Sequence, residues 1–234
     1  MQERFSRQEM LLGEEAVRRL EESSAAVFGI GGVGSYAAEA LARAGVGTLY
    51  LIDGDTVSRS NINRQLIALE STVGRAKAEV MAERIRDINP DCRVFPIAER
   101  YCAERREYFF SLRLGYIVDA IDSVSCKTDL IATALGRGVP IVSALGTGNR
   151  LDASGFVFAD LSETHGCPLA RVMRRELKKL GVAHHTVLYS PEPPMKPLRS
   201  CPDEGRSVPG SVSWVPPAAG LMLAGRAVLE LIKE

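Results

Sequence analysis

One short stretch near the N-terminus limits the possible folds more than any other feature of this chain. An apolar run at residues 25–28 is followed by the turn Gly29-x-Gly31-x-x-Gly34 and an alanine-rich segment over residues 33–44. A glycine turn between a strand and a helix is typical of a βαβ unit, where bare backbone N–H groups at a helix N-terminus hold a phosphate. The next apolar run, residues 48–52, ends at Asp53, whose carboxylate suits ribose hydroxyls. The chain is therefore predicted to bind a nucleotide.

The rest of the chain continues the alternation of strands and helices. Further strands are predicted at residues 93–97, 116–118, 140–144, 156–158 and 186–189, and helices at 5–22, 75–88, 104–110, 124–135, 168–180 and from 216 to 233. This alternation predicts an α/β fold with a doubly wound, mostly parallel, Rossmann-like sheet, extended by C-terminal strands and a helix. We expect one domain, 1–234, with a nucleotide-binding half, 1–150, and a substrate and dimer half, 151–234. The second half holds a proline-rich loop at about 190–210.

Composition and charge set limits on compartment and partners. The 29 basic and 29 acidic residues cancel, so no global basic field marks the chain as a nucleic-acid binder. The basic side chains of residues 168–180 are interpreted as a solvated helix face, with a patch for an RNA backbone as the alternative. No apolar run approaches the ~20 residues of a membrane helix, and the charged N-terminus lacks the apolar core of a signal peptide. A cytoplasmic protein without membrane association is expected.

The five cysteines are scattered and form no Cys-x-x-Cys pair. A four-cysteine zinc site is therefore not expected. We interpret the cysteines as free thiols of a reducing compartment. Cys167 and Cys201 lie in the less regular second half, where a reactive thiol is the alternative.

Cationic residues beyond the second strand favour ATP over NAD as the nucleotide. The segment Asn61-Ile-Asn-Arg64-Gln65 follows the ribose strand, Lys77 opens the next helix, and Arg7 lies near the N-terminus. An adenylating site needs such cations, because a carboxylate approaches the α-phosphate and pyrophosphate must leave with its charge neutralised. We expect Arg64 and Lys77 to be exposed in a cleft. Ordinary solvated surface charges remain the alternative for Lys77 and Arg7.

A pair of aspartates in Asp119-Ala-Ile-Asp122 follows another predicted strand. In a parallel sheet this end of the strand lies beside the glycine turn. Asp122 is a candidate Mg²⁺ ligand, since one carboxylate together with water and phosphate oxygens completes a magnesium shell. The alternative is that Asp122 caps the following helix.

Six motifs, taken together and in this order, resemble the ThiF/MoeB/HesA superfamily of ATP-dependent adenylating enzymes, relatives of the ubiquitin-activating enzymes. They are Arg4-Phe-Ser-Arg7-Gln, Gly29-Ile-Gly-Gly-Val-Gly34, Asp53-Gly-Asp55, Asn61-Ile-Asn-Arg64-Gln, Gly74-Arg-Ala-Lys77 and Asp119-Ala-Ile-Asp122. The resemblance extends from residue 4 to about 145. Within the superfamily, residues 38–43, 77–90 and 119–123 are most similar to the tRNA threonylcarbamoyladenosine dehydratase (TcdA) branch. The missing Cys-x-x-Cys pairs count against the zinc-bearing sulfur-carrier activators.

This resemblance implies an activity and a set of contacts. The implied enzyme uses ATP and Mg²⁺ to adenylate the threonylcarbamoyl carboxylate on a tRNA adenosine, then closes a ring with release of AMP and pyrophosphate. Carried onto this sequence, Gly31 and Gly32 face phosphate, Asp53 the ribose, and Asn61, Arg64 and Lys77 the polyphosphate. Gly29, Gly34, Asp55 and Gln65 complete the nucleotide-binding set. Asp122 holds Mg²⁺, and Arg7 reaches the nucleotide of a partner subunit in a homodimer.

Three other functions stay open at the level of the sequence. The first is an adenylyltransferase that activates the C-terminus of a ubiquitin-like sulfur-carrier protein, with a thioester on Cys167 or Cys201; a sulfur-transfer or carrier protein is then the partner. The second is an NAD-dependent oxidoreductase, which shares the glycine turn and Asp53 but has no use for Arg64 and Lys77. The third is a non-catalytic nucleotide-sensing module.

Overall fold

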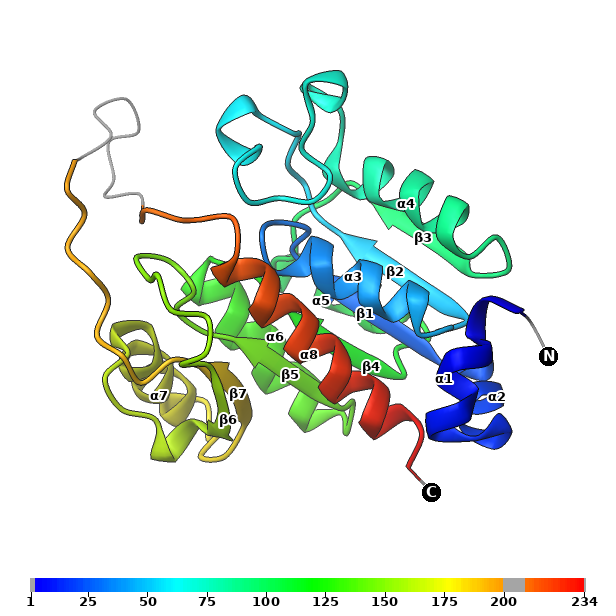
Figure 1. Cartoon of the computed structure of the whole chain (residues 1–234). Coiled ribbons are helices and arrows are strands. Elements are labelled where there is room, and N and C mark those ends of the chain that lie inside the picture. Colours follow the sequence, from blue (N-terminus) through cyan, green and yellow to red (C-terminus); the bar gives the residue numbers. More distant parts are fainter. Residues whose placement is uncertain (1–2, 200–208, 234) are drawn as a thin grey trace.

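The computed structural model describes residues 3–199 and 209–233, and these form an α/β fold around one sheet (Figure 1). The sheet has seven strands in the order β3-β2-β1-β4-β5-β7-β6. All neighbouring strands pair in parallel except β6 and β7, which are antiparallel. The strands are β1 (Ser24–Phe28), β2 (Thr48–Ile52), β3 (Arg93–Ile97), β4 (Tyr116–Asp119), β5 (Ile141–Ala144), β6 (Val157–Asp160) and β7 (Thr186–Tyr189). The predicted mostly parallel sheet is confirmed.

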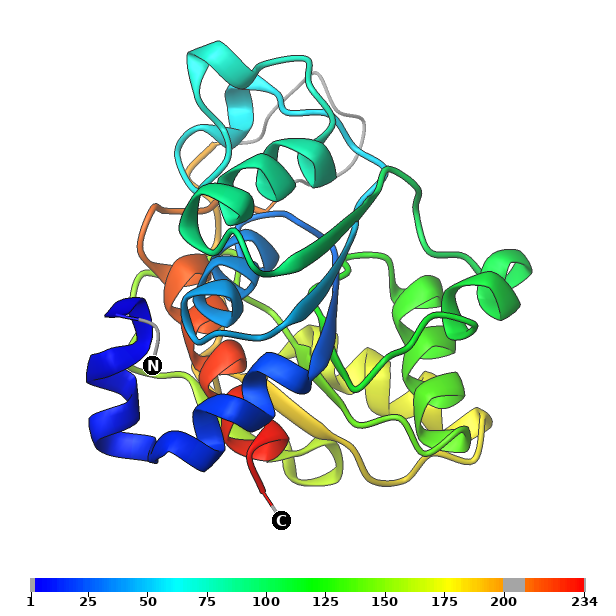
Figure 2. The same ribbon diagram turned by 90° about the vertical axis from the view of Figure 1, so that its right-hand side faces the viewer.

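Helices cover both faces of the sheet, as a doubly wound fold requires (Figure 2). The helices are α1 (Ser6–Leu12), α2 (Glu14–Glu22), α3 (Gly34–Arg43), α4 (Lys77–Ile88), α5 (Arg106–Phe110), α6 (Val124–Gly136), α7 (Pro168–Lys179) and α8 (Val215–Leu231). One core packs α3, α4 and α8 against Ala25 and Val27 of β1. A second core packs α5, α6 and α7 against the alternate residues Ala26 and Phe28. The sheet is therefore buried between two helical layers.

The N-terminal segment differs from the single helix predicted over residues 5–22. Gly13 adopts a φ of 83°, which ends α1 and starts α2 in a new direction. Glycine populates this left-handed region without a Cβ clash, so the chain bends here. Helix α1 is then held at the C-terminal end of α3, where the Gln8 side-chain amide donates to the Ala44 carbonyl at 2.8 Å. The prediction of one continuous helix was wrong at this glycine.

The second half of the chain contributes β6, β7 and α8 to the same sheet and its covering layer. Helix α8 lies directly against α3, and a Cβ on Gly220 would lie only 2.3 Å from the Val33 carbonyl oxygen. Of the predicted proline-rich loop, residues 190–199 and 209–210 contain no helix or strand, while residues 200–208, with Cys201, lie outside the described part. Within the described ranges, no helix has the length and apolar character needed to cross a membrane.

Candidate active site

The glycine loop joins the end of β1 to the first turn of α3. Gly29 has a φ of 89°, and a Cβ there would lie 2.7 Å from the Ala120 carbonyl oxygen. A Cβ on Gly34 would lie 1.7 Å from the Gly29 carbonyl oxygen. The loop is therefore as tight as glycine alone permits, and it leaves backbone N–H groups at the N-terminus of α3. Such groups attract an anion because they lack partners within the helix and carry its positive dipole end.

Asp53 connects the end of β2 to this loop. The Ile30 N–H donates to Asp53 Oδ2 at 2.6 Å, and the Asp55 N–H donates to Asp53 Oδ1 at 2.8 Å. Burial raises the pKa of Asp53, against the attraction of the nearby Lys77 ammonium. Each carboxylate oxygen carries a second lone pair. Asp53 thus fixes the loop and still has acceptor capacity for a ribose hydroxyl.

Asp55 lies between two cations. Lys77 Nζ lies 3.0 Å from Asp55 Oδ2, and Arg100 Nη2 lies 2.6 Å from Asp55 Oδ1. Burial of Asp55 opposes its ionisation, but hydrogen bonds from Arg100 and Lys77 hold the pKa of Asp55 below its usual value. The site therefore contains a charged trio of two cations and one anion.

The expectation that Lys77 is exposed in a cleft was wrong. The residue is only 6% exposed, and its backbone N–H donates to the Asp55 carbonyl at 3.0 Å. Both contacts draw the first turn of α4 against the loop after β2, which buries the lysine stem. The other expected cation, Arg64, is half-buried.

The segment between β2 and α4 lies over the glycine loop. Arg64 donates to the Ser60 carbonyl at 2.8 Å, and its Cγ lies 3.4 Å from where a Gly32 Cβ would be. The side chain of Gln65 is buried, with Nε2 3.7 Å from the equivalent point on Gly31. Its Oε1 is buried without a hydrogen-bond partner among the described residues. A ligand donor is the natural partner for such an oxygen, because a buried acceptor left unpaired is costly.

Asn61 has a structural contact in the same segment. Its side-chain Oδ1 accepts a hydrogen bond from the Ser58 N–H at 3.1 Å, and the residue is 9% exposed. This contact closes the 3₁₀ turn Arg59–Asn61, which precedes Arg64. Asn61 therefore holds the shape of the segment that lies over the glycine loop.

The loop after β4 lies beside Gly29 and presents Asp122 to solvent. The helix that follows is capped at Ser123, so the alternative role of Asp122 as the N-cap residue was wrong. Asp119, in contrast, is fully buried and pairs with the buried Lys127 at 2.8 Å. Lys127 Nζ also donates to the Ile121 carbonyl at 2.9 Å. This buried pair fixes the loop after β4, and Asp122 is the exposed carboxylate of that loop.

Arg7 is not brought to this site within one chain. It is exposed on α1, which contacts the C-terminal end of α3, whereas the glycine loop is at the N-terminal end. Ten helical residues separate these ends by about 15 Å. In the described part of the chain, no group of three or more His, Cys, Asp or Glu side chains is placed to hold a metal ion.

The sequence matches the model of the ThiF family over residues 5–233. The chain belongs to the ThiF family. Among similar proteins, the tRNA threonylcarbamoyladenosine dehydratase of Bacillus subtilis is 41% identical over 245 residues, which cover 100% of this chain and 96% of that relative. The enzyme of the same name from Escherichia coli is 45% identical over 75% of this chain and 66% of that relative. The Escherichia coli dehydratase TcdA, solved in complex with ATP, superposes with a TM-score of 0.89 at 37% identity, over 98% of this chain and 93% of that one.

Three contacts of this ThiF-family site were missed by the sequence reasoning. Arg100 lies three residues beyond the end of β3, and its position after a strand was the available signal. The Asp119–Lys127 pair joins a strand end to a helix eight residues on, and neither residue alone indicates a buried ion pair. Pro216 of α8 lies 3.1 Å from where a Gly32 Cβ would be. No local pattern predicts a contact between segments so far apart.

Proposed function

We propose that this chain is an ATP-dependent tRNA threonylcarbamoyladenosine dehydratase. The observation that carries the proposal is its similarity over the whole chain to the Bacillus subtilis dehydratase. The Escherichia coli relative has been solved with both ATP and AMP, which supports adenylation over the NAD-dependent alternative. The enzyme adenylates the threonylcarbamoyl carboxylate of a modified tRNA and cyclises it, with release of AMP and pyrophosphate.

The chemistry needs an activated carboxylate but no protein nucleophile. A free carboxylate is a poor electrophile because oxide would have to leave, whereas AMP is an adequate leaving group. The neighbouring amide is tethered to the same nucleoside, and proximity supplies ~7 kcal/mol or more. Cys167 is 4% exposed, which disfavours a thioester on this residue. The protein therefore acts by binding, orienting and neutralising charge.

The nucleotide contacts follow from the positions of the side chains. Gly31 and Gly32 offer backbone N–H groups to phosphate, and Asp53 accepts from the ribose. Arg64 and Lys77 neutralise the departing pyrophosphate. To do so, Lys77 exchanges part of its pairing with Asp55 for a phosphate oxygen, while Arg100 continues to neutralise Asp55.

Asp122 fits a magnesium ion that arrives with the nucleotide. It is an exposed carboxylate beside the glycine loop, whereas Asp119 is committed to Lys127. Asp55 and Asp122 both lie close enough to Arg100 to raise its pKa, and the hydrogen bond that Arg100 donates to Asp55 is the larger cause. One protein carboxylate with water and phosphate oxygens is the usual magnesium arrangement. The ion supplies charge stabilisation of the phosphates when bound.

A homodimer completes the site by bringing Arg7 of one subunit to the nucleotide of the other. Close to Arg7 on α1, the side chains of Met10 and Leu11 are 85% and 87% exposed. On α8, Leu221 and Leu229 are 52% and 53% exposed. Figure 1 shows α1 and α8 on the same side of the molecule. Exposed apolar side chains of this kind favour burial against another subunit. In this scheme residues 1–150 bind the nucleotide, and residues 151–234 contact the substrate and the partner subunit. The enzyme acts in the cytoplasm.

The proposed function is tested by AMP release from Mg·ATP. The protein is incubated with unmodified tRNA or with tRNA carrying threonylcarbamoyladenosine. The masses of the nucleosides are then measured by mass spectrometry. AMP formed only with the modified tRNA, with loss of one water from the nucleoside, is the expected result. AMP formation stimulated by a carrier protein and not by tRNA would instead identify an adenylyltransferase for a ubiquitin-like sulfur carrier.

A further inference from the structure

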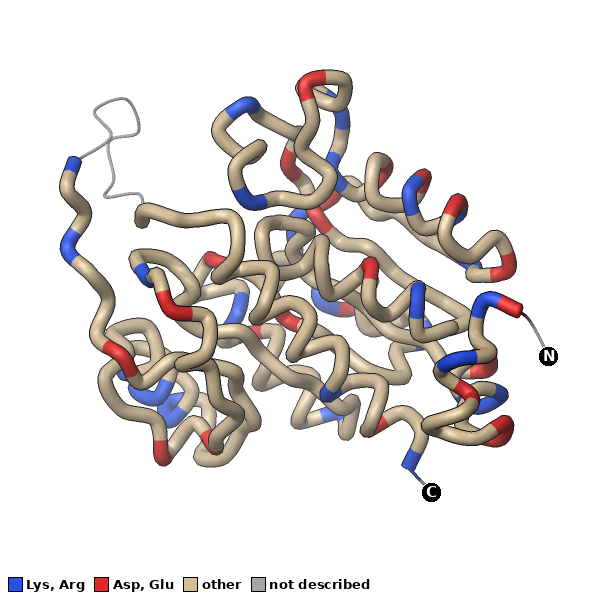
Figure 3. The backbone as a smooth tube through the Cα atoms, viewed as in Figure 1, with Lys and Arg blue, Asp and Glu red and all other residues tan. Residues whose placement is uncertain are grey.

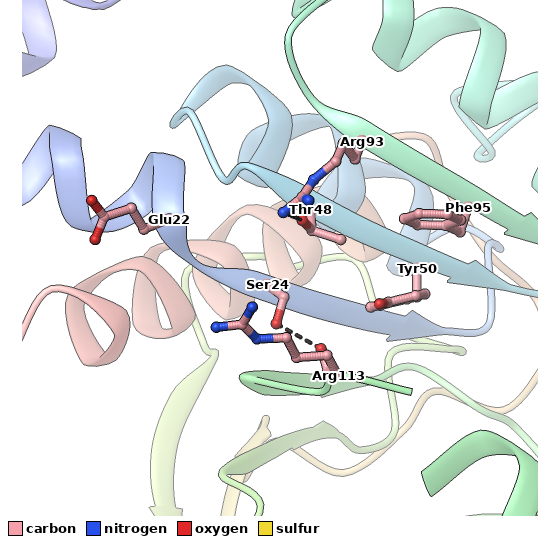
Figure 4. A pocket seen from close by; sticks show the side chains of 7 residues that line it. All are labelled: Glu22, Ser24, Thr48, Tyr50, Arg93, Phe95 and Arg113. Carbon is pink, nitrogen blue, oxygen red and sulfur yellow. Dashed lines mark hydrogen bonds between the residues drawn. The ribbon is translucent and has the colours of Figure 1, made fainter. Parts of the chain in front are cut away.

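A part of one sheet face, at the N-terminal ends of β1, β2 and β3, is left open by the covering helices. On the face under α5, the C-terminal halves of the strands are covered by aromatic packing, with Phe28 5.5 Å from Tyr101 and 5.8 Å from Phe109 between ring centroids. The N-terminal halves of β1, β2 and β3 have no such cover. They form a cavity of about 110 Å³, here named the sheet-face pocket (Figure 4). Its lining residues are Glu22, Ser24, Thr48, Tyr50, Arg93, Phe95 and Arg113.

Two aromatic rings stack on each other in the sheet-face pocket. Tyr50 and Phe95 are register partners on β2 and β3, with ring centroids 5.2 Å apart and planes inclined by 19°. Phe95 is 46% exposed although it lies on a strand. Aromatic side chains exposed on adjacent strands of an open sheet are the platform on which proteins stack unpaired RNA bases.

The sheet-face pocket also has cationic groups that lack an anion. Among the described residues, the Arg93 guanidinium donates to the Thr48 hydroxyl at 2.9 Å and forms no ion pair. The Arg113 guanidinium makes no hydrogen bond or ion pair within residues 3–199 and 209–233. The one acidic lining residue, Glu22, pairs with Arg18 on its own helix at 2.7 Å. Two guanidinium groups beside stacked rings are complementary to a phosphodiester that carries a base.

We propose that the sheet-face pocket binds a nucleotide of the RNA substrate at a distance from the reacting adenosine. A base packs on the Tyr50–Phe95 pair, and Arg93 and Arg113 neutralise the adjoining phosphates. This inference rests on the proposed function, because it takes tRNA as the ligand. It assigns a contact surface separate from the adenylation site.

The position of the pocket suits a long RNA. Strand β3 runs from Arg93 in the pocket to Ile97, shortly before Arg100 at the nucleotide site. Five strand residues extend for about 16 Å. The pocket lies on the sheet face opposite α3, α4 and α8, so a dimer formed through α1 and α8 leaves it accessible (Figure 2).

The test measures tRNA affinity as a function of salt concentration, with full-length protein and unlabelled ATP present. For Arg93→Gln/Arg113→Gln we expect about tenfold weaker binding and a salt slope reduced by about two, since each lost phosphate contact removes about 0.9. For Phe95→Leu we expect about fivefold to tenfold weaker binding with an unchanged slope, because stacking on a base is lost while charge is kept. ATP affinity stays at the parent value in both variants.

The matched control is Arg86→Gln/Lys233→Gln, which removes the same charge from exposed positions on α4 and just beyond α8, on the opposite sheet face. This variant is expected to bind tRNA as the parent does. Equal losses of tRNA affinity in the two double variants would mean that only net charge matters, and would overturn the proposal. A tRNA affinity equal to that of the parent in the Arg93/Arg113 variant would also overturn it. If the parent itself neither binds tRNA nor forms AMP with it, the proposed function fails first. If the parent is active and the sheet-face variants bind normally, only the pocket assignment fails.

Discussion

Among single residues, Lys77 and Arg64, the two cations proposed to neutralise phosphate, differ in how much they contribute to the stability of the fold. Lys77 is buried against Asp55, whereas Arg64 is half-buried and bonded to its own turn. Their charge and their place after a strand were readable from the sequence. The burial of Lys77 was not, because its partner belongs to another element and an ion pair leaves no local pattern.

Replacing these two residues by alanine should separate the two roles. For Lys77→Ala we expect loss of AMP formation together with a fall of about 1–2 kcal/mol in the free energy of unfolding, because a buried pair is broken while Arg100 still neutralises Asp55. For Arg64→Ala we expect loss of AMP formation with a change of no more than about 0.5 kcal/mol. Urea denaturation and AMP release measure the two effects. Equal stability losses would contradict the difference in burial.

Asp122 is a residue whose replacement should act through magnesium alone. In Asp122→Asn the magnesium concentration for half-maximal AMP formation is expected to rise several-fold, since a neutral amide is a weaker ligand than a carboxylate. Unfolding should be unaffected, because the side chain is exposed. The matched control is Asp87→Asn, an exposed aspartate in the last turn of α4, at the opposite end of that helix from Lys77. A magnesium titration identical to that of the parent would remove Asp122 from the metal site.

Among the elements, the strands were the most predictable and the junctions the least. The bounds of β2, β3 and β7 agree with the predicted ones; β2 and β7 are largely buried and read as nearly continuous apolar segments. The break at Gly13 was missed, because the apolar periodicity continues through it on both sides. The glycine loop and Asp53 were predictable as local motifs. The Asp119–Lys127 pair and Arg100 depend on how elements pack, which one sequence does not display.

A buried histidine, His185, immediately precedes β7 and should make the stability of the protein depend on pH. His185 contacts the Ser143 hydroxyl of β5 at 2.8 Å, and burial lowers its pKa from 6.5 to about 4. The unfolded chain therefore takes up the proton first as the pH falls. The contribution of His185 to the free energy of unfolding is complete above pH 6.5 and decreases by up to about 3 kcal/mol towards pH 4.

The measurement for His185 is urea denaturation between pH 4 and pH 7 for the parent and for His185→Gln. The parent should lose more stability over this window than the variant does. His184→Gln is the matched control, because the neighbouring histidine is 80% exposed in its side chain. Parallel pH profiles for the parent and His185→Gln would refute the assignment.

At the scale of the whole molecule, the cations of the proposed site come from two places that one chain does not bring together. The glycine loop and Arg64 are at the carboxyl ends of the strands, while Arg7 is at the other end of α3. The positions of the charges do not display this layout, because Lys and Arg are scattered along the chain (Figure 3). Because α1 packs at that end, the proposed role of Arg7 depends on a second subunit.

A dimer with shared sites predicts complementation between two inactive variants. Arg7→Ala and Arg64→Ala are each expected to form little AMP. After unfolding and refolding together in equal amounts, half of the dimers are mixed, and each mixed dimer has one site with both arginines. About a quarter of the parental rate should therefore return. Refolding each variant alone is the control, and no recovery in the mixture would place Arg7 outside the site.

The contact between Gly220 and Val33 has a consequence for the order in which the molecule is made. The glycine loop leaves the ribosome well before α8, which packs on it. Domains fold largely as units during synthesis, so a nascent chain presents this loop with its apolar flank uncovered until α8 docks. A nucleotide site built on this loop is therefore complete only after α8 has been synthesised.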